Sequence, residues 1–286
     1  MRKIGIEASA YYSPTTLELS EIVAGFRAMK EHGYDAVDYQ NFVDTEAPLF
    51  TLGEQEFEKT LADHRAAAKE AGIEIYQVHG PWRYPPQDAT EEERAERFEK
   101  MAKSIRGTHL LGCRHFVIHP IMPFGPDTEP DSAAFQSLNH DFFEKLLKVA
   151  KSEDVVICLE NMPFAAHSIA RPHEISAFVR SFNDPHMRMC LDTGHSLILG
   201  TQPVEAVREA GDLIEALHVH DNDGRGDQHR MPYYGVCDWK AFSEAVREYL
   251  PETVVMSMET MTPWKMPAEL RDYFGRGLAK MARALC

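Results

Sequence analysis

Residues 155–195 read VVICLENMPFAAHSIARPHEISAFVRSFNDPHMRMCLDTGH. An apolar run of strand length, Val155–Glu160, is followed by an amphipathic stretch, His173–Ser181, and then by a second apolar run, Met187–Asp192. Two buried strands separated by a helix are typical of a parallel βαβ unit. Each apolar run also ends on a carboxylate, which is costly to bury without a partner. The stretch therefore predicts a parallel sheet with reactive groups at its strand ends.

The same alternation extends in both directions over the 286 residues. Predicted strands are Ile4–Ala8, Ala36–Tyr39, Ile73–His79, His115–His119, Val155–Glu160, Met187–Asp192, Glu215–His220 and Thr253–Glu259. Predicted helices are Leu19–His32, Glu54–Ala71, Glu91–Leu111, Ser132–Ser152, His173–Ser181, Pro203–Ala210, Trp239–Leu250 and Pro267–Leu285. This order predicts an α/β fold, a single-domain (β/α)₈ TIM barrel over residues 1–286. A doubly wound open sheet is the alternative, but no glycine-rich phosphate loop follows the first strand.

The composition, with 44% hydrophobic and 26% charged residues, is that of a soluble globular protein. No apolar run approaches the roughly 20 residues needed to cross a bilayer, and the short apolar start before Glu7 does not fit a signal peptide. Five scattered cysteines without a CxxC pair predict buried free thiols in a reducing cytoplasm. A formal net charge of −15 disfavours nucleic acid as a partner, although local basic patches could still form.

Residue types that bind metals gather at the C-terminal ends of the predicted strands. They are His79, His119, Glu160, Asp192, His195, His218, His220, Asp227, His229 and Glu259. Because the strand tips of a parallel barrel surround one mouth, we expect these side chains to meet there. Histidine mixed with carboxylates suits Zn²⁺ or Mn²⁺, with Co²⁺ and Mg²⁺ as alternatives, better than Ca²⁺. The sequence therefore predicts a divalent metal centre.

His218 and His220 share one face of the seventh strand because they are two residues apart. We expect His220 to reach the mouth as the metal ligand, and the deeper His218 to support it or to contact substrate. Aromatic and cationic residues near the mouth are candidates for substrate binding. These are Trp82, Arg83, Arg225 and Trp264. Aromatic rings stack on sugars and arginine pairs with phosphate or carboxylate, but loop packing and solvated charge explain these residues equally well.

Together these residues resemble the xylose isomerase-like barrel superfamily, in particular the branch that holds sugar phosphate isomerases and epimerases together with endonuclease IV. The motifs are Leu159-Glu160-Asn161, Leu191-Asp192-Thr193-Gly194-His195, and His218-Val219-His220-Asp221-Asn222-Asp223-Gly224 continued by Asp227-Gln228-His229. The resemblance runs from His79 to Glu259 in the family's order.

The resemblance implies that one metal is bound by Glu160, Asp192, His220 and Glu259. It also implies that the two glutamates act as acid and base, without deciding which is which. The endonuclease branch holds three zinc ions, so that one to three metals per chain are expected here. The further ligands would be His79, His119, His195, Asp227 and His229.

Two departures separate this chain from the endonuclease pattern. Met162-Pro163 follows Glu160-Asn161 where a glycine-rich turn is expected, and Gly194 replaces a cysteine before His195. We therefore expect a cytoplasmic isomerase, epimerase or related lyase acting on a sugar, sugar phosphate or polyol, with a metal-stabilised enediolate. The alternatives are a zinc-dependent phosphodiesterase or AP endonuclease, another metal hydrolase, and a non-enzymatic binding protein. Barrels of this kind often form homo-oligomers.

Overall fold

Eight parallel strands form the centre of the molecule in this computed structural model, which describes residues 1–125, 131–260, 262 and 265–286. The strands are β1 (Ile4–Glu7), β2 (Ala36–Tyr39), β3 (Glu74–His79), β4 (His115–Ile118), β5 (Val156–Glu160), β6 (Met187–Asp192), β7 (Ile214–His218) and β8 (Met256–Met258). Their order is β7-β6-β5-β4-β3-β2-β1-β8. A parallel bridge between Val219 and Met258 joins the two end strands, so the sheet is a nearly closed barrel. The predicted (β/α)₈ fold is confirmed.

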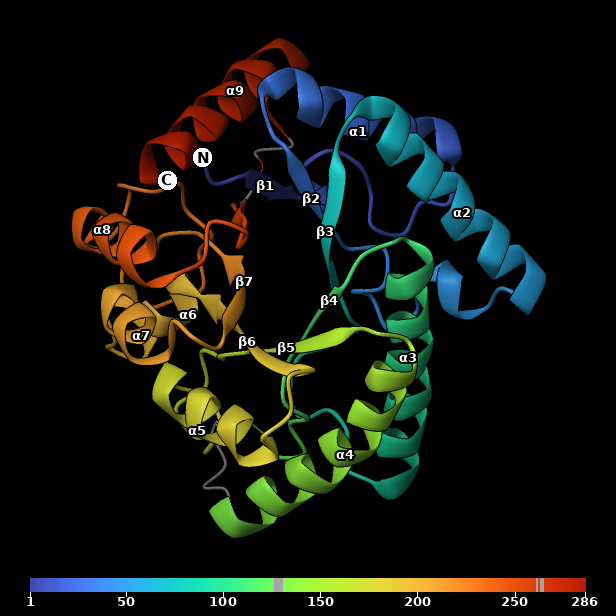
Figure 1. Cartoon of the computed structure of the whole chain (residues 1–286), viewed down its shortest axis with the longest axis vertical. Coiled ribbons are helices and arrows are strands. Elements are labelled where there is room, and N and C mark those ends of the chain that lie inside the picture. Colours follow the sequence, from blue (N-terminus) through green and yellow to red (C-terminus); the bar gives the residue numbers. More distant parts are fainter. Residues whose placement is uncertain (126–130, 261, 263–264) are drawn as a thin grey trace.

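Helices surround the strands on the outside of the barrel (Figure 1). They are α1 (Leu19–His32), α2 (Glu54–Ala71), α3 (Glu91–Leu110), α4 (Ser132–Ser152), α5 (Pro172–Phe182), α6 (Thr193–Ile198), α7 (Pro203–Ala210), α8 (Trp239–Tyr249) and α9 (Ala268–Leu285), with 3₁₀ turns η1 (Ala8–Ala10) and η2 (Pro48–Phe50). Local signals set their ends. Thr90 and Glu93 form a reciprocal capping box that starts α3, and Gly72 ends α2 with a φ of 71°. None of the described helices is long and apolar enough to span a bilayer.

The chain departs from the sequence prediction after β6 and β7. Helix α6 follows β6 directly, because the Asp192 carboxylate accepts the backbone N–H of His195 at 2.6 Å and caps a helix too short to show a periodic pattern. Strand β7 ends at His218 rather than His220. Beyond it, Asp221 exchanges two 2.8 Å backbone hydrogen bonds with Arg230, which turns the chain out of the sheet.

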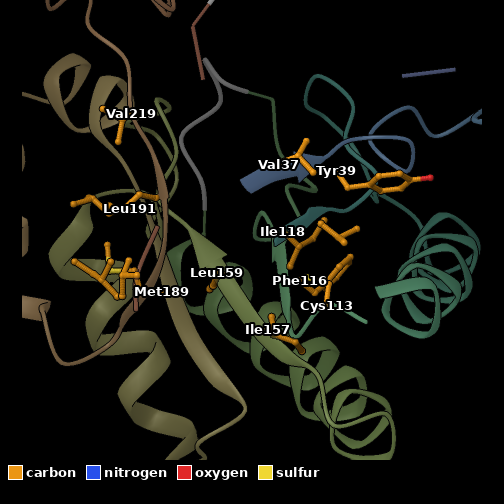
Figure 2. Packing of buried hydrophobic residues seen from close by; sticks show 14 of the residues in the cluster. Val37, Tyr39, Cys113, Phe116, Ile118, Ile157, Leu159, Met189, Leu191 and Val219 are labelled. Atoms are coloured by element: carbon orange, nitrogen blue, oxygen red, sulfur yellow. The ribbon is translucent and has the colours of Figure 1, made fainter. Parts of the chain in front are cut away.

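Alternating residues of each strand supply two different layers. On β5, Ile157 and Leu159 pack outward into the large core beneath the helices (Figure 2). Val156 and Cys158 point inward, and Glu160 follows them on the same face. The inner apolar layer consists of Val117, Val156, Cys158, Cys190 and Ala216. The ligand candidates on β5, β6 and β7 stand one step above it, at the C-terminal mouth.

Candidate metal centre

The structure brings all nine expected metal-binding positions to the mouth of the barrel, together with His218. Each contacts at least one other within 3.9 Å. The positions are His79, His119, Glu160, Asp192, His195, His220, Asp227, His229 and Glu259. They come from β3 through β8 and the loops that follow them, which are distant in sequence.

Glu160 lies at the centre and contacts four histidines. Its Oε2 is 3.0 Å from His119 Nε2 and 3.6 Å from His79 Nε2. Its Oε1 is 3.1 Å from His218 Nδ1 and 3.5 Å from His195 Nδ1. The side chain is 1% exposed. One carboxylate therefore connects two sets of candidate ligands.

Three carboxylates and a histidine form the densest set, which we call the three-carboxylate group: Glu160, Asp192, His218 and Glu259. One ligand atom from each lies within 4.8 Å of the ligand atoms of the others. The histidine in this group is His218, whereas the sequence predicted His220. His220 Nε2 is 3.0 Å from Asp192 Oδ2, and its ligand neighbours are His229 and Glu259.

Two further sets flank the three-carboxylate group. On one side, His79 and His119 share Glu160 with it. On the other side, Asp227 Oδ2 lies 3.2 Å from His195 Nε2 and 3.1 Å from His229 Nε2. The ring of His229 stacks on that of His220 at 4.1 Å with an interplanar angle of 4°.

Several imidazoles donate one ring N–H away from the centre. His79, His195 and His229 each donate from Nδ1 to a backbone carbonyl, and their Nε2 atoms face carboxylates. The acceptors are Gly80 (2.8 Å), Asn161 (2.8 Å) and Glu259 (2.9 Å), respectively. With Nδ1 held by a carbonyl, Nε2 is the nitrogen that would bind a metal in exchange for its proton.

The electrostatics of the mouth favour a bound cation. Among the described residues, the ion partners of Glu160, Asp192, Asp227 and Glu259 are histidines, with no Lys or Arg. Burial opposes ionisation of Glu160, but the facing imidazoles of His218 and His119 outweigh it and hold its pKa well below the ordinary value. Nδ1 of His119 and of His220 is buried and has no hydrogen-bond partner in the described part of the chain. Clustered buried carboxylates with imidazole nitrogens are a donor set that fits a divalent transition metal.

Local sequence explains how Asp192 is held. The Asn161 amide donates to the Asp192 carbonyl at 2.9 Å and accepts the Asp192 N–H at 2.8 Å. Gly194 permits His220 to pack closely, because a Cβ at position 194 would lie 2.0 Å from His220 Cε1. The Asn and Gly of the two motifs thus position candidate ligands.

The expected substrate residues lie at different places around the mouth. Trp82 is half-buried, with its ring edge-on to His119 at 5.6 Å, and its Nε1 has no hydrogen-bond partner within the described residues. Arg83 is half-buried in the same loop, and Arg225 is exposed in the loop after β7. Trp264 lies outside the described residues.

Sequence reasoning missed two buried acids on the first strands. Asp38, on β2, accepts from His218 Nε2 at 2.9 Å and from Gln77 Nε2 at 3.1 Å. Glu7 ends β1, and burial raises its pKa. The signal was present, because both carboxylates stand in apolar runs. Asp38 was not predicted as a site residue because Tyr39 follows it, so the apolar run of this strand does not end on the acid.

The chain resembles known proteins over most of its length. The family described as xylose isomerase-like TIM barrel matches residues 26–282. A D-psicose 3-epimerase of Enterocloster bolteae is 26% identical over 210 residues, which cover 70% of this chain and 64% of that enzyme. The chain therefore spans less than two thirds of this relative's length.

Solved structures share the fold at lower sequence identity. The 3-keto-D-glucoside 4-epimerase of E. coli superposes with a TM-score of 0.76 at 19% identity and covers 99% of this chain and 100% of its own. The IolI protein with a bound zinc atom superposes with a TM-score of 0.73 at 18% identity, covering 98% and 96%. At these identities the likeness is one of fold.

Proposed function

Since the chain belongs to the xylose isomerase-like TIM barrel family, we propose that it is a divalent-metal-dependent isomerase or epimerase of a sugar, a sugar phosphate or a polyol. The observation that carries the proposal is the three-carboxylate group at the barrel mouth, which places two glutamates, an aspartate and a histidine around one point. The similarity to a psicose epimerase and to a ketoglucoside epimerase supports the substrate class.

In this proposal Glu160, Asp192, His218 and Glu259 hold the metal, with His218 in place of the His220 expected from the sequence. Zn²⁺ or Mn²⁺ suits this mixture of imidazole and carboxylate, with Co²⁺ and Mg²⁺ as alternatives. When bound, such a cation supplies Lewis-acid stabilisation of negative charge on the substrate's oxygens.

Glu160 and Glu259 carry the proton transfers. One carboxylate removes a proton from carbon, and the other returns a proton to the same carbon in an epimerase or to its neighbour in an isomerase. The two carboxylates flank His218 Nδ1, at 3.1 Å for Glu160 and 3.4 Å for Glu259. The side chain of Glu259 is 12% exposed against 1% for Glu160, so Glu259 is the better placed to exchange its proton with solvent.

The test is hydrogen exchange at carbon. The metal-loaded protein is incubated in D₂O with a panel of ketoses, their phosphates and inositols, and deuterium incorporation is followed by mass spectrometry. We expect incorporation that depends on Mn²⁺, Co²⁺ or Zn²⁺ and that is lost in Glu259→Gln. Absence of bound metal, with no response to any added metal, would refute the proposal.

A second candidate function is metal-dependent hydrolysis of a phosphodiester. The observation that favours it is the pair of flanking ligand sets, His79 with His119 and His195 with Asp227 and His229, which exceed what one cation needs. About three zinc ions per chain and cleavage of abasic-site DNA or a small phosphodiester would establish it. The net charge of −15 disfavours a nucleic-acid substrate. A non-enzymatic sugar-binding protein would show neither activity.

We also propose a cytoplasmic location. All five cysteines are free, and Cys113, Cys158 and Cys190 are buried. Unpaired thiols are typical of a reducing compartment. A homo-oligomeric state remains part of the proposal, and its test is the mass in solution by light scattering.

A further inference from the structure

Beneath the three-carboxylate group lies an acid that belongs to none of the ligand sets. Asp38 comes from β2, on the far side of the barrel interior from β7, and its side chain is 1% exposed. Its Oδ2 accepts two hydrogen bonds, from His218 Nε2 at 2.9 Å and from Gln77 Nε2 at 3.1 Å. Its Oδ1 is buried and finds no hydrogen-bond partner among the residues that the structure describes.

These contacts fix which nitrogen of His218 faces the mouth. A carboxylate can only accept a hydrogen bond, so Nε2 of His218 must carry its proton when it faces Asp38. The other nitrogen, Nδ1, then faces Glu160 at 3.1 Å and Glu259 at 3.4 Å, and by the same rule it carries a proton until a cation takes that proton's place. A ring flip would place a carbon atom against Asp38 and lose this charge-assisted bond.

We propose that Asp38 is the positioning residue of the metal centre, which holds His218 with Nε2–H on Asp38 and Nδ1 directed at the three-carboxylate group. The inference rests on the proposed function, because an effect of Asp38 on metal affinity requires the metal site. The orientation of His218 itself follows from the hydrogen-bond geometry. Gln77 donates to the same oxygen of Asp38, and its amide also approaches the Leu217 carbonyl at 3.4 Å.

A purely structural role explains Asp38 poorly. Among the described residues it has no Lys or Arg partner, and one of its oxygens is unsatisfied. Burying a carboxylate in this way is costly compared with an apolar side chain of the same size. The cost is understandable if the charge raises the basicity of an imidazole that binds a cation, as outer carboxylates do at metal sites.

The first measurement is Zn²⁺ affinity, by competition with a chromophoric chelator, for the wild type, Asp38→Ala and Asp38→Asn. Loss of an outer partner typically weakens metal binding by about 10- to 100-fold, and we expect this for Asp38→Ala. Asp38→Asn should lose less, because its amide oxygen can accept from both donors. Gln77→Leu is the matched control: it removes a buried hydrogen bond to Asp38 but leaves that of His218, and we expect a loss below about threefold.

The second measurement is the ¹⁵N–¹H spectrum of the His218 ring, with and without zinc. In the wild type we expect a protonated, exchange-protected Nε2 in both states, and loss of this protection in Asp38→Ala. Folded Asp38→Ala with wild-type zinc affinity would overturn the inference. If the wild type bound no zinc, the proposed function would fail, and the spectrum alone would decide the inference: an unprotonated or freely exchanging Nε2 would overturn it.

Discussion

Gly194 illustrates how single residues constrain the mouth of this barrel. It follows Asp192 in the first turn of α6, and the His220 ring occupies the place that a side chain would need. The His220 ring also contacts Asp192 and stacks on His229. Displacing this one ring would therefore disturb two of the ligand sets.

We expect Gly194→Ala to destabilise the protein and to weaken metal binding together. Overpacking typically costs about 1–3 kcal/mol, measured here by urea unfolding, with metal content determined on the same samples. Gly277→Ala in α9 is the control, since a Cβ there meets no atom of the described residues within 4 Å. It should be neutral or stabilising by roughly 0.5–1 kcal/mol. Equal effects of the two substitutions would contradict the steric explanation.

We expect substitutions of Glu160 and of Asp227 to remove different numbers of metal ions from the protein. Glu160 joins the His79–His119 set to the three-carboxylate group, whereas Asp227 contacts His195 and His229. After dialysis against trace Zn²⁺, we expect Glu160→Gln to lose metal throughout and Asp227→Asn to lose at most one ion per chain. Elemental analysis by mass spectrometry measures this. The same metal content in both variants would refute a central role for Glu160.

At the scale of elements, the periodic patterns predicted most of the barrel. Helices α1, α2, α4 and α7 begin and end at the predicted residues. The pattern failed in two places: α6 is too short to show a period and depends on the Asp192 cap, and β7 ends early because Asp221 pairs with Arg230. The sequence prediction extended this strand to His220 and took that residue as the ligand at the mouth. In the structure His218 is the last residue of the strand. Which of two histidines meets three carboxylates depends on strands far apart in sequence, and no local pattern records it.

Helix α2 carries a buried histidine whose titration affects stability. His64 Nδ1 forms a 2.8 Å hydrogen bond with the Tyr39 hydroxyl. Burial lowers the pKa of His64 to about 4. The unfolded chain takes up this proton near the ordinary pKa of about 6.5. Between pH 6.5 and pH 4 the unfolded chain binds this proton and the folded chain does not. The free energy of unfolding is therefore highest above pH 6.5 and falls as the pH is lowered toward 4.

We expect His64→Gln to flatten the pH dependence of unfolding. Because one pKa unit corresponds to about 1.36 kcal/mol, the wild type should lose up to roughly 3 kcal/mol more than the variant between pH 6.5 and pH 4. Urea unfolding at four pH values measures the difference. His173→Gln, at an exposed position on α5, is the control and should keep the wild-type slope. A parallel fall in His64→Gln would refute the assignment.

At the scale of the whole molecule, the candidate ligands come from six consecutive strands and their loops, so only the closed barrel assembles them. A cation that binds the folded state alone raises stability by about 4 kcal/mol at a thousand times its Kd. We expect chelation to lower the midpoint of thermal unfolding by several degrees, and Zn²⁺ or Mn²⁺ to restore it while Ca²⁺ does not. Calorimetry measures the shift. No shift on chelation of a metal-containing sample would contradict a site formed only by folding.

The seam where β7 and β8 close the barrel links metal binding to local opening of the sheet. In the described part of the chain, two backbone hydrogen bonds cross it, from Val219 to the Ser257 carbonyl and from Glu259 to the Val219 carbonyl. His218 lies on the β7 side of this seam and Glu259 on the β8 side. A cation bound by both would hold the two strands together where few hydrogen bonds join them and local opening costs least. Amide deuteration at Val219 and Glu259 would then report occupancy directly: protection there should rise on metal loading, while the β4–β5 amides remain unchanged.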